Sequence, residues 1–175
     1  MTRLFVAAWP PDETCAQLAG LVAATAALGE RRVPQENWHV TLRFIGDADP
    51  DEVADRLADA TLPSATARLG PTVVDLDGRQ VVVPVGGVDA LAAAVATATG
   101  GIGTPPSRPF RGHITLARVK PRPDLTDASE SQGRSPLLGE PVSGTFTIGE
   151  IALVSSDTRP DGATYTTVAT FPTAR

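Results

Sequence analysis

Residues 38–46 of the chain read WHVTLRFIG, and residues 112–119 read GHITLARV. Both stretches contain the same run: a histidine, a β-branched residue, threonine and leucine. The chain has 175 residues and two histidines, and each histidine begins one of these runs. Successive side chains of a strand point to opposite faces. We therefore expect His39 to share a face with Thr41, and His113 to share a face with Thr115.

The sequence around the two runs predicts strands alternating with short helices. Strands are expected at residues 3–9, 38–45, 72–76, 79–85, 113–119, 142–154 and 163–171. Helices are expected from a cap at Asp12 to Gly29, from Asp49-Pro50 through Leu57, and over 88–99. Turns are expected at Asp77-Gly78 and over 157–162, and an exposed loop over 120–141.

A strand and a helix precede each histidine in the same order, which indicates a structural duplication. We predict an α+β fold of two pseudo-symmetric lobes, each an antiparallel sheet with helices. The active-site cleft is expected between the lobes. Residues 1–175 are predicted to form one two-lobed domain.

Composition and charge exclude several classes of protein. The chain is 42% apolar and 20% charged, without a continuous apolar run long enough to cross a membrane. No secretory signal is recognisable at the N-terminus, and Cys15 is the single cysteine, so we expect a cytoplasmic protein. The net charge of −5 argues against a protein that coats nucleic acid, although it says little about a local site for one phosphate.

Two imidazoles beside two hydroxyls are suited to phosphodiester chemistry. Imidazole titrates near neutral pH, so one ring can act as a base while the other acts as an acid. Threonine hydroxyls can donate to the non-bridging oxygens of a phosphate. In-line opening of a phosphodiester needs a base for water, an acid for the departing oxygen, and such donors. This reasoning leaves open which of the two ester bonds breaks.

Other interpretations of the histidines are weaker. A single strand histidine is usually a packing or surface residue, but a repeated pattern makes that explanation less economical for the pair. Neither run has Asp or Glu at the spacing of metalloenzymes, so we expect no metal site and no cofactor. A nucleophilic elbow around serine is absent, and Cys15 is far from both histidines in the sequence.

Residues 36–46 and 108–118, with the opening residues 3–7 and the closing residues 161–165, resemble the two-histidine phosphoesterases. The likeness is greatest to their bacterial and archaeal branch of RNA 2′,3′-cyclic phosphodiesterases, also called 2′-5′ RNA ligases. It implies a bilobal fold and metal-independent hydrolysis of an RNA 2′,3′-cyclic phosphate to a 2′-phosphomonoester. By this resemblance His39 is the general acid that protonates O3′, His113 is the general base, and Thr41 and Thr115 hold the phosphate.

The chain departs from the family pattern at two places, which leaves the base-binding surface open. Gly112 stands where proline is common, and Val83-Pro84 replaces a segment that often carries tryptophan. Aromatic residues could supply that surface. Phe44 and Phe110 are candidates for stacking on a base, although strand parity points Phe44 toward the core, and Tyr165 is expected near the cleft or simply within the last strand.

Arginines surround both runs and predict a locally positive cleft. They are Arg31, Arg32, Arg43, Arg108, Arg111, Arg118 and Arg122, together with Lys120. Arg118 follows the second run as the family's phosphate-binding arginine does. Strand parity puts Arg118 on the face opposite His113 unless a bulge re-aims it, and puts Arg43 on the face of His39. Both remain candidates for binding substrate.

The expected partner is RNA that ends in a 2′,3′-cyclic phosphate. The alternatives are the same chemistry on a small cyclic nucleotide or ADP-ribose cyclic phosphate, or a protein that binds RNA ends without catalysis. A preference for oligomers over mononucleotides would favour RNA, and tight binding without turnover would favour the binder. We expect a monomer without an obligatory protein partner.

Overall fold

A computed structural model describes residues 2–25, 31–119, 135–159 and 162–174. The helices are α1 (Asp12–Ala24), α2 (Pro50–Ala58) and α3 (Asp89–Ala98), with a 3-10 turn η1 (Gln35–Asn37). The strands are β1 (Thr2–Ala8), β2 (Arg31–Arg32), β3 (Val40–Ala48), β4 (Ala65–Leu69), β5 (Val74–Leu76), β6 (Gln80–Gly86), β7 (His113–Arg118), β8 (Gly144–Ile148), β9 (Glu150–Arg159) and β10 (Gly162–Pro172).

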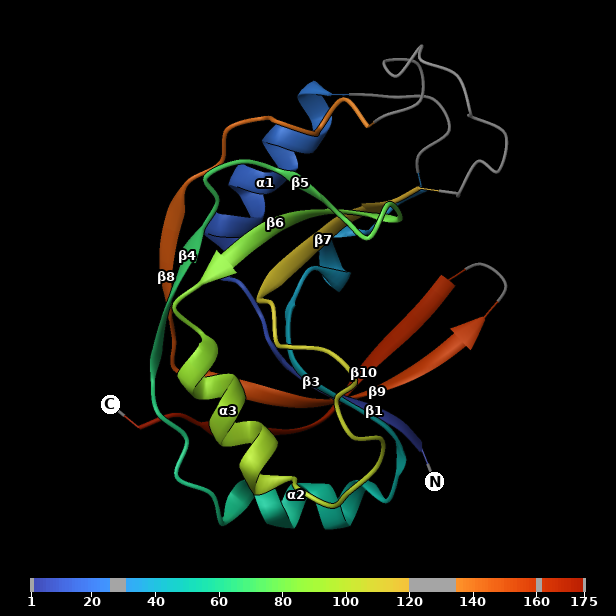
Figure 1. The fold of residues 1–175 in the computed structure, drawn as a ribbon, viewed down its shortest axis with the longest axis vertical. Helices are drawn as coiled ribbons and strands as arrows, with labels where there is room; N and C mark the ends of the chain where they lie inside the picture. The colour runs from blue at the N-terminus through green and yellow to red at the C-terminus, as the bar shows by residue number, and fades with distance from the viewer. Residues whose placement is uncertain (1, 26–30, 120–134, 160–161, 175) are drawn as a thin grey trace.

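The strands form one curled antiparallel sheet in the order β10-β9-β1-β3-β7-β6-β4-β8, with β2 on β7 and β5 on β6 (Figure 1). We call β10, β9, β1 and β3 the first lobe, and β7, β6, β4 and β8 the second lobe. The lobes join where β3 pairs with β7, through Val40 and Ile114. The two motif strands are therefore neighbours at the centre of the sheet.

The predicted duplication is visible in the topology. The first half runs β1-α1-β3 and the second runs β6-α3-β7, and in each half the two strands pair directly. Each helix reaches the other lobe: α3 lies against β3, and Gln17 of α1 donates to the Ser143 carbonyl oxygen beside β8 at 2.7 Å. These exchanged helices tie the two lobes together.

Each motif strand carries a β-bulge at its leucine. Val6 pairs with Arg43 and Ala7 with Thr41, so Leu42 has no partner in that ladder. Val81 pairs with Ala117 and Val82 with Thr115, which leaves Leu116 out in the same way. A bulge inserts one residue and reverses the facing of the residues after it. Residues after each leucine therefore point to the face opposite the one that simple alternation from the histidine predicts.

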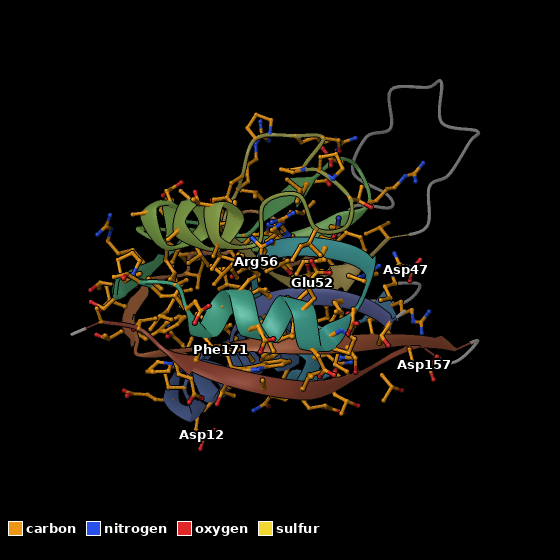
Figure 2. All side chains as sticks on the ribbon, turned by 90° about the horizontal axis from the view of Figure 1, so that it is seen from below. Asp12, Asp47, Glu52, Arg56, Asp157 and Phe171 are labelled. Atoms are coloured by element: carbon orange, nitrogen blue, oxygen red, sulfur yellow. The ribbon has the colours of Figure 1, made fainter. Side chains whose placement is uncertain are left out.

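The sheet of the first lobe carries apolar side chains on both faces. Leu4, Val6 and Ala8 of β1 belong to the main hydrophobic core. Phe5 and Ala7 point to the other face, where they form a smaller cluster with Ala152 and Val154, against which Trp9 and Tyr165 pack. Figure 2 shows α2 between α3 and the strands β9 and β10, on the outside of the main core.

Most predicted elements are present, with four corrections. The first helix ends at Ala24, with Thr25 as its C-cap, and not at Gly29. The helix cap is not Asp12, because Asp12 is the first residue of α1 and Pro11 precedes it without a side-chain cap. The single strand predicted over 142–154 is two strands, β8 in the second lobe and β9 in the first, separated at Gly149. Strands β2 and β4 were not predicted. The predicted turn at 157–162 and loop at 120–141 fall partly outside the described residues.

The hairpin at Asp77-Gly78 and the Asp49 cap are confirmed: β5 pairs with β6, and the Asp49 carboxylate accepts from the Asp51 amide at 3.0 Å. No helix in the described part of the chain is both long and apolar enough to span a bilayer.

Candidate active site

His39 precedes β3 and lies in the smaller apolar cluster of the first lobe. Its ring centroid is 5.0 Å from that of Phe5 and 5.3 Å from those of Trp9 and Tyr165. The Phe5 ring is tilted against the imidazole, whereas Trp9 and Tyr165 meet it edge-on. We call the sheet face that carries His39 the motif face. Three aromatic rings thus hold the imidazole in place and exclude water from much of it.

His113 is the first residue of β7 and pairs with Pro84 of β6. Its Nδ1 is 2.7 Å from the Arg111 carbonyl oxygen, and His39 Nδ1 is 2.7 Å from the Asn37 carbonyl oxygen. A carbonyl oxygen can only accept, so both Nδ1 atoms carry hydrogen. In each ring Nε2 is then the atom that can exchange a proton with a ligand. The two halves therefore orient their histidines in the same way.

The two imidazoles are close enough to interact electrostatically. Burial lowers the pKa of His39 most strongly, and the positive charges of His113 and Arg118 lower it further, against the opposing hydrogen bond to Asn37. The neutral form of His39 is favoured in the free protein. Once protonated, such an imidazole is a stronger acid than an unperturbed one.

The two threonines share the motif face with the histidines. Thr41 pairs with Ala7, whose side chain lies in the cluster around His39. Thr115 Oγ1 donates to Gln80 Oε1 at 3.3 Å, and Gln80 is the strand partner of Arg118. The Gln80 amide nitrogen remains available to donate. Gln80 was not predicted as a site residue, because no sequence motif marks a single glutamine beside the Asp77-Gly78 hairpin as functional.

Arg118 is exposed and lies on the motif face because of the bulge at Leu116. Leu116 and Ala117 are both buried, so the alternation breaks between them and Arg118 turns back to the side of Thr115. Burial is the main cause of the lowered pKa of His39, and the charge of Arg118 makes a smaller contribution in the same direction. The structure thus places Arg118 with the two histidines and the two threonines.

Arg43 does not join this group, and the parity argument for it is wrong. The bulge at Leu42 turns Arg43 toward the core, where 7% of the residue is exposed. Its guanidinium donates to the carbonyl oxygens of Ala96 at 3.2 Å and Ile102 at 2.9 Å, and also to the Thr99 hydroxyl. These acceptors lie at and beyond the C-terminal end of α3. Arg43 therefore ties α3 to β3.

The same bulge corrects the expectation for Phe44. Phe44 is 46% exposed and pairs directly with Phe5, so it lies on the motif face and not in the core. Phe110, by contrast, packs against the main core. Tyr165 faces His39 and Phe5, and its ring is edge-on to both.

The predicted positive surface is smaller than the sequence suggested. Arg32 donates to the carbonyl oxygens of Val22 and Thr25, and Arg108 forms an exposed ion pair with Asp77 at 2.7 Å. Lys120 and Arg122 lie outside the described residues. Within the described part of the chain, Arg118 is the arginine whose charge acts on His39, and Arg31 pairs with it across β2 and β7.

A cavity of about 490 Å³ lies elsewhere, between α1 and the β4–β6 edge of the second lobe. None of the motif residues lines it. Among the described residues, no three or more His, Cys, Asp or Glu side chains are grouped as metal ligands would be. The arrangement that can do chemistry is thus two imidazoles, two hydroxyls, an amide and a guanidinium on the motif face.

Comparison with known proteins adds independent evidence. A model of the 2′-5′ RNA ligase superfamily matches residues 10–160. No curated protein matches the chain. Among solved structures, one described as a phosphoesterase is 24% identical, with 99% of each chain covered and a TM-score of 0.77.

Two further structures are similar. Escherichia coli LigT complexed with 3′-AMP is 24% identical over 99% of each chain, with a TM-score of 0.77. The protein TT0787 of Thermus thermophilus is 28% identical over 97% of each chain, with a TM-score of 0.69. The expected α+β fold is thus shared across the whole length of these chains.

Proposed function

Because the chain belongs to the 2′-5′ RNA ligase superfamily, whose members act on phosphodiester bonds, we propose that it hydrolyses 2′,3′-cyclic phosphate ends of RNA to 2′-phosphomonoesters. The observation that carries this proposal is the matched placement of His39 and His113. Their equivalent Nδ1 hydrogen bonds leave both Nε2 atoms available for proton transfer.

In the proposed reaction a water molecule attacks the phosphorus of the cyclic phosphate. His113 Nε2 takes the proton of this water as the new P–O bond forms. The P–O3′ bond breaks on the opposite side, and His39 Nε2 gives its proton to O3′. The product carries a 2′-phosphate and a free 3′-hydroxyl. His113 then loses its proton to solvent and His39 regains one, which restores the starting state of the pair.

The electrostatics around His39 are consistent with the role of acid. Its lowered pKa makes the imidazolium a strong donor toward a departing alkoxide. The same lowering reduces the protonated fraction in the free protein. A bound phosphate brings a negative charge close to His39, so substrate binding raises the protonated fraction of its imidazole.

Thr41, Thr115 and Arg118 would bind the non-bridging oxygens. A hydroxyl from each lobe and one guanidinium can each donate to an equatorial oxygen and stabilise the charge that develops there. Gln80 would hold the Thr115 hydroxyl in place through the 3.3 Å hydrogen bond. In this proposal the reaction uses side chains alone and needs no metal ion or other cofactor.

The test is turnover of a defined RNA end. Purified protein, with a metal chelator present, is incubated with an oligoribonucleotide that ends in a 2′,3′-cyclic phosphate. We expect an oligomer that ends in a 2′-phosphate. A 3′-phosphate product would reverse the assignment of the broken bond, and an unchanged substrate would reject the proposed activity.

A further inference from the structure

The cavity of about 490 Å³ in the second lobe begins one strand away from His113. It reaches from β6 across β4 to the segment before β8 and to α1, and its wall includes Arg68, Gly70, Gly86, Ser143 and Gln17. The Gly70 amide donates to the Pro84 carbonyl oxygen at 2.9 Å, and Pro84 is the strand partner of His113. The cavity therefore adjoins the strand that supports the second histidine.

Two residues of the cavity wall point to the motif face. Gly86 comes two residues after Pro84 on β6, so both lie on one face of the sheet, and Arg68 of β4 pairs directly with Gly86. The burial pattern agrees with this facing, because Arg68 is exposed while its two neighbours along β4 are buried in the main core. Arg68 and the two histidines thus share a face.

Arg68 gives the cavity wall a positive charge. No carboxylate lines the cavity, and the ion pair found among the described residues joins Arg108 to Asp77 elsewhere. The Arg68 guanidinium lies against the backbone of Gly87, where a Cβ would be 3.3 Å from its Cζ and Nη2 atoms. The Ser143 hydroxyl can donate as well. A guanidinium and a hydroxyl beside bare glycine backbone suit the oxygens of a phosphate.

The position of the guanidinium excludes the phosphate that reacts. On a regular sheet, two strand spacings of about 4.8 Å and two residue steps of about 3.3 Å put the Cα atoms of Arg68 and His113 about 12 Å apart. The guanidinium points further away, since Gly87 lies beyond Gly86 along β6. Arg68 would therefore bind a second phosphate of the same ligand. A 2′,3′-cyclic phosphate is the 3′ end of an RNA, so its other phosphates belong to nucleotides on the 5′ side.

We propose that Arg68 and the cavity beside it bind a phosphodiester group upstream of the cyclic end, as a second anchor for the RNA chain. Such a contact carries no information about base sequence, because the backbone phosphates of all nucleotides are alike. The preferred substrate is then an oligoribonucleotide of any sequence, not a mononucleotide. This inference rests on the proposed function, which supplies the RNA end at the histidines.

The experiment compares uridine and adenosine 2′,3′-cyclic phosphates with tetranucleotides of uridine and of adenosine that end in the same groups. The first variant is Arg68→Met. The second is Gly86→Asp, which brings a carboxylate to Arg68 without crowding, because a Cβ at Gly86 would meet no atom within 4 Å. Gly86→Asn is its uncharged control. Arg56→Met is the matched arginine control, because Arg56 is exposed on α2, at the opposite end of the molecule from α1 (Figure 1).

Wild type should have a higher kcat/KM on the tetranucleotides than on the mononucleotides. Arg68→Met should lower kcat/KM on both tetranucleotides about 10-fold, as expected for one hydrogen bond to a charged group, and leave the mononucleotide values unchanged. Gly86→Asp should cause the same selective loss, whereas Gly86→Asn and Arg56→Met should not. Equal losses on all substrates, a loss confined to one base sequence, or unchanged tetranucleotide values in Arg68→Met would overturn the proposal.

Binding tests the same contact without catalysis. Dissociation constants of a tetranucleotide that ends in a 2′-phosphate are measured over a range of salt concentrations. For a single strand, each phosphate contact contributes about 0.7 to the slope of log Kd against log salt concentration. Arg68→Met should reduce the wild-type slope by about that amount, and Arg56→Met should not. If wild type turns over no cyclic substrate, the proposed activity fails, and the slope still decides the role of Arg68: an unchanged slope in Arg68→Met rejects it.

Discussion

Arg43 and Arg118 lie on opposite faces of the central sheet, although each follows a His-x-Thr-Leu run. Arg43 is buried and bonded to residues at and beyond the end of α3, whereas Arg118 is exposed beside Gln80 on the motif face. The two residues differ in their place relative to the bulged leucine: Arg43 follows Leu42 directly, and Arg118 stands one position further on. One guanidinium supports the fold and the other is available to a ligand.

We predict that Arg118→Met and Arg43→Met separate activity from stability. Arg118→Met should lower kcat/KM about 10- to 100-fold, the value of a hydrogen bond to a charged group, and change the melting temperature little. Arg43→Met should lower the free energy of unfolding by about 3 kcal/mol, because several acceptors near the end of α3 lose their donor. Thermal melts and steady-state kinetics on both variants check this. The reverse pattern would contradict the placement of the two arginines.

The hydroxyls and Gln80 give a second prediction. Thr41→Val and Thr115→Val keep the shape of the side chain and should each lower kcat/KM about 10-fold or more. Gln80→Leu should lower it less, since Gln80 acts mainly through Thr115. A double-mutant cycle should find Gln80 coupled to Thr115 and independent of Thr41. Additive effects for Gln80 and Thr115 would show that their hydrogen bond has no part in binding substrate.

A third prediction concerns pH. Burial lowers the pKa of His39 most, and the nearby His113 and Arg118 lower it further. The unfolded chain therefore binds a proton near pH 6.5, where the folded chain binds one less readily. His39 therefore contributes stability above about pH 6.5 that is lost as the pH falls toward its folded pKa. Wild type should lose more unfolding free energy than His39→Gln between about pH 7.5 and pH 5.5. Equal slopes would contradict the buried environment of His39.

Nuclear magnetic resonance can follow the same group directly, because the chain has only two histidines. The ring protons of His39 should titrate below the ordinary histidine value in the free protein. Adding a nucleoside 2′-phosphate should move that titration upward, as the anion offsets the nearby cations. A midpoint that the nucleotide leaves unchanged would place His39 away from the bound phosphate.

The roles of acid and base can be separated by the leaving group. A cyclic substrate whose 3′ oxygen is replaced by sulfur departs as a thiolate, which needs little protonation. His39→Ala should regain much of its lost rate on this substrate, and His113→Ala should not. Rescue of His113→Ala instead would exchange the two roles, a result that the near-symmetry of the two motifs makes worth testing.

The sequence predicted the elements of the sheet because its apolar alternation and turn residues are local signals. It also placed His39 on one face with Thr41, and His113 on one face with Thr115, since each pair is only two residues apart on a strand. The sequence did not predict which way the side chains face beyond Leu42 and Leu116. A bulge depends on how a strand pairs with its neighbour, so the facing of Arg43, Phe44 and Arg118 could not be read from parity.

The end of β8 and the start of β9 at Gly149 could not be predicted for a related reason. Strands β8 and β9 are consecutive in sequence and belong to different lobes, a property of topology and not of composition. Gln80 reaches Thr115 from the neighbouring strand β6. The aromatic rings around His39 come from two segments distant in sequence, residues 5–9 and β10. Such contacts exist only once the sheet is assembled.

The central claim is that His39 and His113 form one acid–base pair. The most direct measurement is single-turnover hydrolysis of an RNA 2′,3′-cyclic phosphate by wild type, His39→Ala, His113→Ala and the double variant, with folding checked by thermal melts. Each single variant should be slower by about 10²- to 10⁴-fold. The loss of rate in the double variant should be much smaller than the product of the two single losses, because the residues act as a unit. Wild-type rates in either single variant would contradict the account.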